Sequence, residues 1–159
     1  MRRPEPGTFS IALELARDFR PAKLDLVVPF TTVRQTRTAL DEANRMAPGL
    51  NADVRLVKIQ VIPYPLQLEE KPVYLGFLQK QLDHLRAGTA ACSELHFARE
   101  FEPALLATLS NESVVVLAGK RRPWPTRVDR LAASLREEGY PVILVSGDRG
   151  DRSQYVCRK

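Results

Sequence analysis

The alternation of apolar and polar residues divides most of this chain into short strands and amphipathic helices. Between residues 113 and 145, two aliphatic runs, VVVL and VILV, flank one helical stretch. Such runs are typical of strands that are covered on both faces. In the stretch between them, Thr126 and Asp129 have the spacing of a capping box, and Gly139 can end the helix. A strand, a helix and a strand in this order predict a parallel βαβ unit.

Similar patterns extend this unit toward the amino terminus. They predict further strands at 24–30, 54–62 and 92–98, and helices at 32–47, at about 72–85 and from about residue 103. Five strands then alternate with four helices. The predicted fold class is therefore α/β, a doubly wound five-stranded parallel sheet with helices on both faces.

Several apolar residues in these elements are expected to face the core. Val33 belongs to the apolar stripe of the first helix, and Phe77 belongs to that of the second. Cys92, at the start of the third strand, is expected to be a small buried hydrophobe.

The chain is expected to form one domain with an irregular segment at each end. Residues 24–146 hold the α/β pattern, residues 1–23 form an amino-terminal extension, and residues 147–159 form a charged tail. Within the extension, FSIALELARDF alternates as a strand would and also fits a short helix, so both alternatives stay open.

Composition limits the classes of function. The chain has 159 residues and a formal net charge of +5, a modest excess that favours anionic partners only weakly. Cys92 and Cys157 are too few for a disulfide framework. No charged-then-apolar leader is present, and no apolar run approaches the roughly 18 residues of a membrane span. These features lead us to expect a cytoplasmic protein without a membrane partner.

The strand sequences resemble those of the universal stress protein family. The resemblance covers about residues 24–145 and rests on four segments, LDLVVPF, VKIQVIP, SVVVLAG and GYPVILV. It implies a five-stranded parallel sheet with helices on both sides. It also implies a homodimer that pairs near the fifth strand, here Pro141 to Val145.

The sequence departs from the family's nucleotide-binding pattern. Where those members have an Asp after the first strand, this chain has Thr31 and Thr32. The nucleotide-binding members also have a Gly-x-x-Gly turn after the fourth strand, followed later by a Gly-Ser pair. In this chain Arg122 occupies the position of the second glycine, and Leu131 and Ala132 occupy the positions of the Gly-Ser pair. Side chains at glycine positions block the approach of backbone amides to phosphates. We therefore expect no ATP binding of the family's usual kind.

The loop after the fourth strand is the strongest candidate for a binding site. Ligands of parallel sheets lie beyond the carboxyl ends of the strands, and a helix amino terminus favours an anion there. Trp124, between two prolines, offers a ring for stacking, whereas a solvated basic loop is the alternative interpretation. The candidate anion-binding residues are Thr31, Thr32, Gly119, Lys120, Arg121 and Arg122.

No sequence pattern indicates catalysis, a metal or a cofactor. His84 has the position of a helix-terminal histidine, and His96 with Cys92 would need two further ligands for zinc. The loop is not a Walker loop, and no nucleophile elbow is present. We therefore expect a non-enzymatic regulatory or interaction protein without a cofactor. The first alternative is an anion-binding protein that uses the basic loop, and nucleic-acid binding is a less favoured second alternative.

Overall fold

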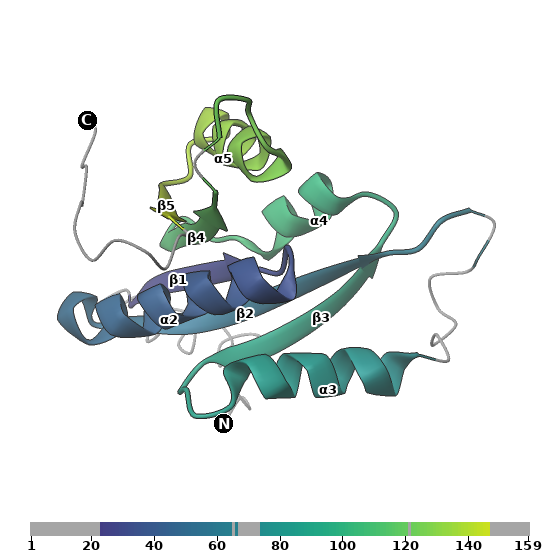
Figure 1. The fold of residues 1–159 in the computed structure, drawn as a ribbon, viewed down its shortest axis with the longest axis horizontal. Helices are drawn as coiled ribbons and strands as arrows, with labels where there is room; N and C mark the ends of the chain where they lie inside the picture. The colour runs from purple at the N-terminus through teal and green to yellow at the C-terminus, as the bar shows by residue number, and fades with distance from the viewer. Residues whose placement is uncertain (1–22, 65, 67–73, 121, 147–159) are drawn as a thin grey trace, which may run out of the picture.

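The computed structural model describes residues 23–64, 66, 74–120 and 122–146. Strands and helices alternate along this part of the chain (Figure 1). In chain order they are β1 (Leu24–Pro29), α2 (Val33–Leu50), β2 (Ala52–Val61), α3 (Leu75–Arg86), β3 (Cys92–Ala98), α4 (Phe101–Thr108), β4 (Ser113–Gly119), α5 (Arg127–Glu137) and β5 (Val142–Ser146). Most of the proposed extension and the whole of the tail, with Cys157, lie outside the described residues.

The strands form one parallel sheet in the order β3-β2-β1-β4-β5. The chain moves from β1 outward to β2 and β3, and it crosses back to the other side of β1 for β4 and β5. This order makes the fold doubly wound and confirms the predicted fold class.

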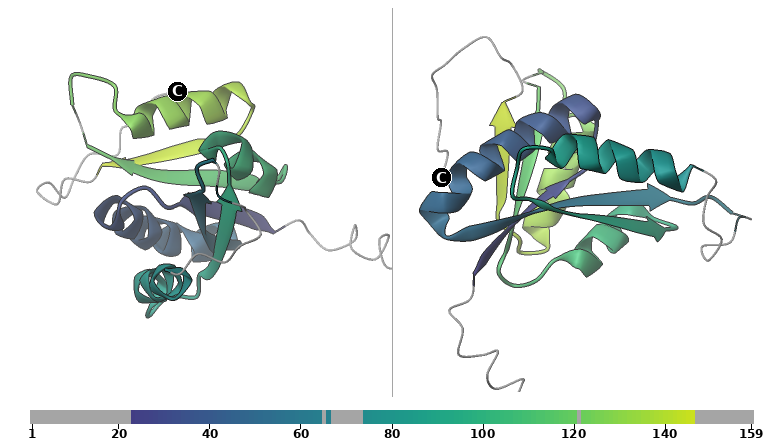
Figure 2. Two further views of the ribbon diagram at one scale, coloured as in Figure 1. Left: turned by 90° about the vertical axis from the view of Figure 1, so that its right-hand side faces the viewer. Right: turned by 90° about the horizontal axis from the view of Figure 1, so that it is seen from below.

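Helices cover both faces of the sheet (Figure 2). On one face, α2 and α3 pack over a core that includes Leu26, Leu40 and Leu56. On the other face, α4 and α5 pack over a core that includes Leu105 and Leu117. Because strand side chains alternate between faces, β1, β2 and β4 contribute to both cores. This explains the apolar runs at Leu26–Val28 in β1 and Val114–Ala118 in β4.

Several predicted details are wrong. Val33 and Phe77 are 42% and 66% exposed. Val33 is the first residue of α2, and Phe77 lies off the face of α3 that buries Leu78, Leu82 and Leu85. Helix α2 continues through Pro48 to Leu50 and ends at Asn51, which adopts the left-handed conformation. Cys92 is exposed, because it begins β3, an edge strand of the sheet.

A charged network joins the amino ends of four strands. The Arg55 Nη2 atom on β2 lies 2.6 Å from the Asp25 Oδ2 atom on β1, and Arg55 Nη1 lies 3.2 Å from Glu94 Oε2 on β3. Arg55 also donates to the carbonyl of Thr108 at the end of α4, at 2.8 Å. The hydroxyl of Ser113, at the start of β4, donates to Asp25. These contacts compensate for the partial burial of the guanidinium group.

Candidate functional site

A cavity opens at the point where the connections of the sheet diverge. Strands β1 and β4 are neighbours, but β1 leads into α2 on one face and β4 leads into α5 on the other. In doubly wound sheets this switch point leaves a crevice at the carboxyl ends of the two strands. The cavity has a volume of about 370 Å³. Its described lining consists of Thr32, Arg34, Gln35, Lys120, Arg122, Thr126, Arg127 and Val128.

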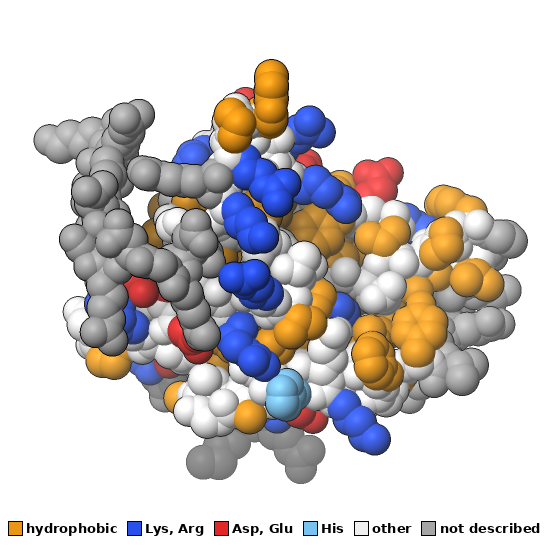
Figure 3. Space-filling model, in the orientation of Figure 1, with side chains coloured by type: hydrophobic (Ala, Val, Ile, Leu, Met, Phe, Trp, Pro, Cys, Tyr) orange, Lys and Arg blue, Asp and Glu red, His pale blue; other side chains and the backbone are white. Residues whose placement is uncertain are grey.

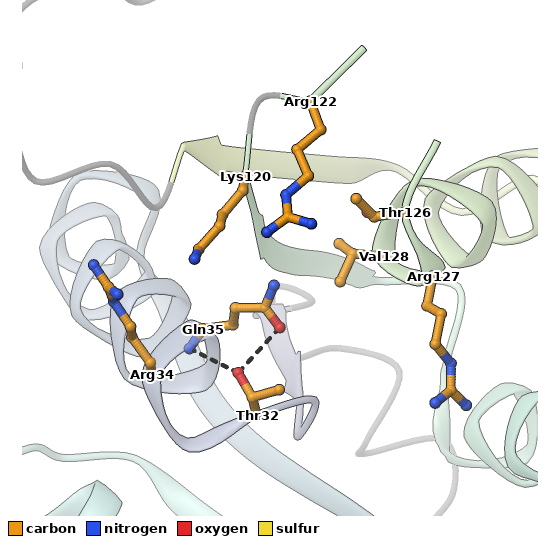
Figure 4. Close-up of a pocket in the computed structure, with 8 residues that line it drawn as sticks. All are labelled: Thr32, Arg34, Gln35, Lys120, Arg122, Thr126, Arg127 and Val128. Atoms are coloured by element: carbon orange, nitrogen blue, oxygen red, sulfur yellow. Dashed lines mark hydrogen bonds between the residues drawn. The ribbon is translucent and has the colours of Figure 1, made fainter. Parts of the chain in front are cut away.

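The lining side chains approach the cavity from two directions (Figure 4). Lys120 and Arg122 point from the loop after β4 toward Gln35 on α2. Arg34 and Arg127 extend on the two sides of this group. The cavity therefore has a basic rim to which both helices and the loop contribute.

Two helices begin at this cavity, and each is capped by a threonine. The Thr32 hydroxyl accepts a hydrogen bond from the Gln35 backbone N–H at 3.3 Å and donates to Gln35 Oε1 at 3.1 Å. The Thr126 hydroxyl accepts from the Asp129 backbone N–H at 3.3 Å, which confirms the predicted cap. The first four N–H groups of an α-helix have no partner within the helix, and each threonine cap satisfies one of them, so two partially positive helix ends face the same crevice.

The carboxylate in the first turn of α5, that of Asp129, is engaged by the cap and is not among the described lining residues. Asp129 Oδ2 accepts from the backbone N–H and the hydroxyl of Thr126, both at 2.7 Å. These two hydrogen bonds lower the pKa of Asp129. Among the described lining residues none carries a carboxylate, and no described ion pair involves Arg34, Lys120, Arg122 or Arg127. The cavity can therefore attract an anion without first displacing an internal partner.

The structure brings together part of the predicted site. Thr32, Lys120 and Arg122 line the cavity. Thr31 does not, and its backbone N–H donates to the buried hydroxyl of Thr36 at 3.1 Å. Gly119 ends β4, and a side chain there would meet Val128 at an ordinary contact distance of 3.7 Å. Arg121 lies outside the described residues.

Sequence reasoning left five lining residues out of the predicted site, Arg34, Gln35, Thr126, Arg127 and Val128. Thr126 is the N-cap of α5, and the other four lie in the first turn of a helix that follows a central strand. The signal was available in part, because first-turn residues after a parallel strand lie at the carboxyl edge of the sheet. The order of the strands in the sheet decides which two helices begin at the same crevice. Local sequence patterns do not predict that order.

The histidines and Cys92 lie elsewhere. His84 is exposed in the last turn of α3, as expected. His96 lies on β3, and its Nε2 atom is 3.0 Å from Glu94 Oε2. Within the described ranges, no three His, Cys, Asp or Glu side chains come together as a metal site, and no helix is long and apolar enough to cross a membrane.

Comparison with known proteins shows the fold. Neither a family model nor a curated protein matches the chain. Among solved structures, a protein of the universal stress protein family from Burkholderia pseudomallei has a TM-score of 0.51 at 19% identity, and the match covers 79% of this chain and 98% of that chain. The universal stress protein from Archaeoglobus fulgidus has a TM-score of 0.54 at 16% identity, with 78% and 98% covered. The fold is that of the universal stress proteins.

A third similar structure is a universal stress protein in complex with cAMP. Its TM-score is 0.52 at 18% identity, and the match covers 80% of this chain and all of that chain, 100%. At these identities the likeness concerns the fold alone, so the ligand has to be argued from the side chains.

Proposed function

We propose that this protein is a non-catalytic regulatory protein of the universal stress protein type, acting in the cytoplasm, whose cavity binds a small anionic ligand. One observation carries the proposal: Lys120 and Arg122 point into a cavity at the starts of two helices and have no described ion-pair partner. Fixed positive charge and helix amino termini together favour phosphate or a similar anion.

The composition of the lining favours binding over catalysis. The described lining offers guanidinium, ammonium, amide and hydroxyl groups. It lacks a histidine, cysteine or carboxylate that could act as a general base or a nucleophile at neutral pH. The hydroxyls of Thr32 and Thr126 are engaged in helix caps. The proposed role is therefore recognition of an anion, with no bond made or broken.

The same geometry argues against ATP binding of the family's usual kind. Arg122 occupies the position where the nucleotide-binding pattern has its second glycine, and its side chain extends toward Gln35. A side chain in this place keeps a triphosphate from lying against the backbone. The complex with cAMP describes what that universal stress protein binds, and it does not identify the ligand of this chain. For this chain we propose a smaller or differently placed anion, with phosphate and pyrophosphate as the first probes.

Calorimetry and thermal unfolding with pyrophosphate test the proposal. Pyrophosphate at a hundred times its dissociation constant should stabilise the wild-type protein by about 2.7 kcal/mol. The double variant Lys120→Ala/Arg122→Ala should lose this stabilisation, whereas Arg86→Ala/Arg136→Ala removes the same net charge from other exposed positions and should keep it. An equal response in both variants, or no response in the wild type, would refute the site. Micromolar ATP binding at physiological salt would refute the exclusion of ATP.

A second candidate function is assembly through β5, because this strand lies at an edge of the sheet. Leu144 on β5 is 40% exposed, and an apolar edge is a surface that proteins usually cover. We propose a homodimer that pairs along Pro141 to Val145. Val142→Lys should give monomers or insoluble protein, whereas Ser93→Lys on the opposite edge strand β3 should leave the assembly unchanged. A wild-type chain that sediments as a monomer at tens of micromolar would contradict this assembly.

A further inference from the structure

A band of cations extends beyond the cavity. We define the basic band as Arg34, Arg37, Lys120, Arg122, Arg127 and Arg130, all of which are exposed. Arg34 and Arg37 are three residues apart on α2, and Arg127 and Arg130 are three apart on α5, so each pair lies on one side of its helix. Figure 3 shows basic side chains in a band that crosses the molecule from α5 to α2.

Within the described part of the chain, the cations of the band differ from the others. Among the described residues, no ion pair or side-chain hydrogen bond occupies the charged groups of the band. Outside the band, the charged group of every described lysine or arginine except Lys80 donates to a side-chain or backbone oxygen: Lys23, Arg45, Arg55, Lys58, Arg86, Arg99 and Arg136. Like charges three residues apart on a helix repel each other. An anion lying along the band would remove that repulsion.

The band is longer than a small anion requires. Arg37 and Arg130 are not among the described residues that line the cavity. A single phosphate held by Lys120 and Arg122 would leave these two guanidinium groups without a role. A chain of regularly spaced phosphates would engage them together with the cavity residues, which favours an extended polyanion.

Trp124 indicates which polyanion the band fits. It lies in the loop between Lys120 and α5, is flanked by Pro123 and Pro125, and is 79% exposed. A rigidly placed, solvent-exposed indole is costly to leave in water and is a stacking platform for an unpaired base. Arginine predominates in the band, and its planar guanidinium group pairs with phosphate in a bidentate manner and stacks on bases. A flat bilayer surface would not follow the hollow that interrupts the band at the cavity.

We propose that the basic band and Trp124 bind single-stranded nucleic acid, with the phosphates along the band and a base stacked on the indole. The proposal shares four cations with the cavity, and it does not require the small ligand. Anionic membranes and acidic proteins are the competing partners, and the experiment below separates them.

Fluorescence anisotropy of the full-length protein with labelled oligouridine and oligothymidine, each about a dozen nucleotides long, is the test. Each phosphate contact contributes about 0.7 to the slope of log affinity against log salt for a single strand, so the full band predicts a slope of about −4. Affinity should therefore fall roughly 250-fold between about 50 mM and 200 mM salt.

Two sets of variants link the binding to the band. Arg37→Ala/Arg130→Ala should make the slope shallower by about 1.4, whereas Arg86→Ala/Arg136→Ala should behave as the wild type. Trp124→Ala should weaken binding roughly tenfold with an unchanged slope, and Trp124→Phe should restore most of it. Equal slopes in the two arginine variants, or no oligonucleotide binding at about 50 mM salt, would overturn the proposal.

The competing partners and the small-anion site have their own readouts. Binding to phosphatidylserine vesicles or to polyglutamate that equals or exceeds oligonucleotide binding would overturn the proposal in favour of that partner. Arg37→Ala/Arg130→Ala should still bind pyrophosphate. If pyrophosphate fails to bind the wild type while oligouridine binding depends on the band, the small-ligand site is refuted and the nucleic-acid site stands. The reverse result refutes the nucleic-acid site alone.

Discussion

Arg55 at the amino end of the parallel sheet and the cavity arginines at its carboxyl end differ in whether they form ion pairs. At the amino end, Arg55 lies between Asp25 and Glu94 and also donates to a carbonyl of α4, and its side chain is only 19% exposed. At the carboxyl end, Arg34 and Arg122 line a cavity, and no described ion pair involves either.

Burial explains the difference. A guanidinium group removed from water loses its hydration and needs acceptors within the protein, whereas an exposed one keeps water as its partner. The amino-end charges are therefore part of what holds the strands together. The cavity charges at the carboxyl end remain free to contact the proposed ligand, so position along the sheet separates the charges that stabilise the fold from those of the proposed site.

The largest effect should come from breaking the amino-end network. Arg55→Ala leaves Asp25 and Glu94 half-buried without their cation, so the free energy of unfolding should fall by about 2–3 kcal/mol in chemical denaturation. The matched control is Arg86→Ala, which breaks an exposed pair with Asp83 and should cost less than about 0.5 kcal/mol. Equal losses in the two variants would show that burial does not decide the role of these arginines.

The pH dependence of this loss follows from Glu94. Burial acts to raise the pKa of Glu94, but its hydrogen bond with His96 and the charge of Arg55 outweigh burial and lower the pKa. A carboxylate with a lowered pKa stabilises the fold above its unfolded pKa, and this contribution disappears as the pH falls through the folded value. The difference between wild type and Arg55→Ala should therefore narrow below about pH 4.3.

Lys58 is a buried cation that has no carboxylate partner among the described residues, so it offers a second test of whether burial makes charge pairing necessary. Lys58 on β2 is 7% exposed, and its Nζ atom lies 3.4 Å from the centroid of the Phe30 ring and 3.3 Å from Gln81 Oε1. Burial lowers the pKa of Lys58. Lys58→Met should raise the free energy of unfolding by about 1 kcal/mol at neutral pH, because it removes a charge whose burial is poorly compensated.

The direction in which this stability difference changes with pH tests whether charge burial causes it. As the pH rises through the lowered pKa of folded Lys58 toward the unfolded value of about 10.4, the folded protein loses the buried charge first. The wild type should then gain stability relative to Lys58→Met. The exposed Lys80→Met should show neither effect. A gain for Lys58→Met that is the same at every pH would indicate better packing and not charge removal.

The helix cap beside the cavity should have a similar or smaller effect. Thr126→Ala removes the hydroxyl that accepts from the Asp129 N–H, and it should lower the free energy of unfolding by about 1 kcal/mol in chemical denaturation. Thr126→Ser retains the hydroxyl and should restore most of this loss. Wild-type stability in the alanine variant would show that the cap contributes nothing to α5.

The smallest effect on stability should come from the cavity cations themselves. Lys120→Ala/Arg122→Ala relieves repulsion between exposed like charges, so the free energy of unfolding should rise by no more than about 0.5 kcal/mol at low salt. High salt screens these charges and should abolish the gain. A loss of more than about 1 kcal/mol would mean that these side chains are structural, as at the amino end.

The sequence by itself determined the elements of this fold. Apolar runs predicted β1 and β4, because a strand covered on both faces has no polar side. The other three described strands were also predicted, although β2 and β3 carry charged residues. Local hydrogen bonding predicted the capping box at Thr126, and Gly139 has the positive φ of 91° expected at the end of α5. The prediction was wrong for Phe77, which is apolar but lies off the face of α3 that buries Leu78, Leu82 and Leu85.

Only the tertiary structure decided which residues share the site. Lys120 and Arg122 could be predicted, because they follow a central strand and precede a helix. Thr32 was predicted through the family resemblance. Arg34 and Gln35 were not, because they are far from the basic loop in sequence and no local pattern links them to it. They meet it because β1 pairs with β4, so that the starts of α2 and α5 border one crevice. Strand order depends on long-range pairing across the whole sheet, and no local pattern of residues carries that information.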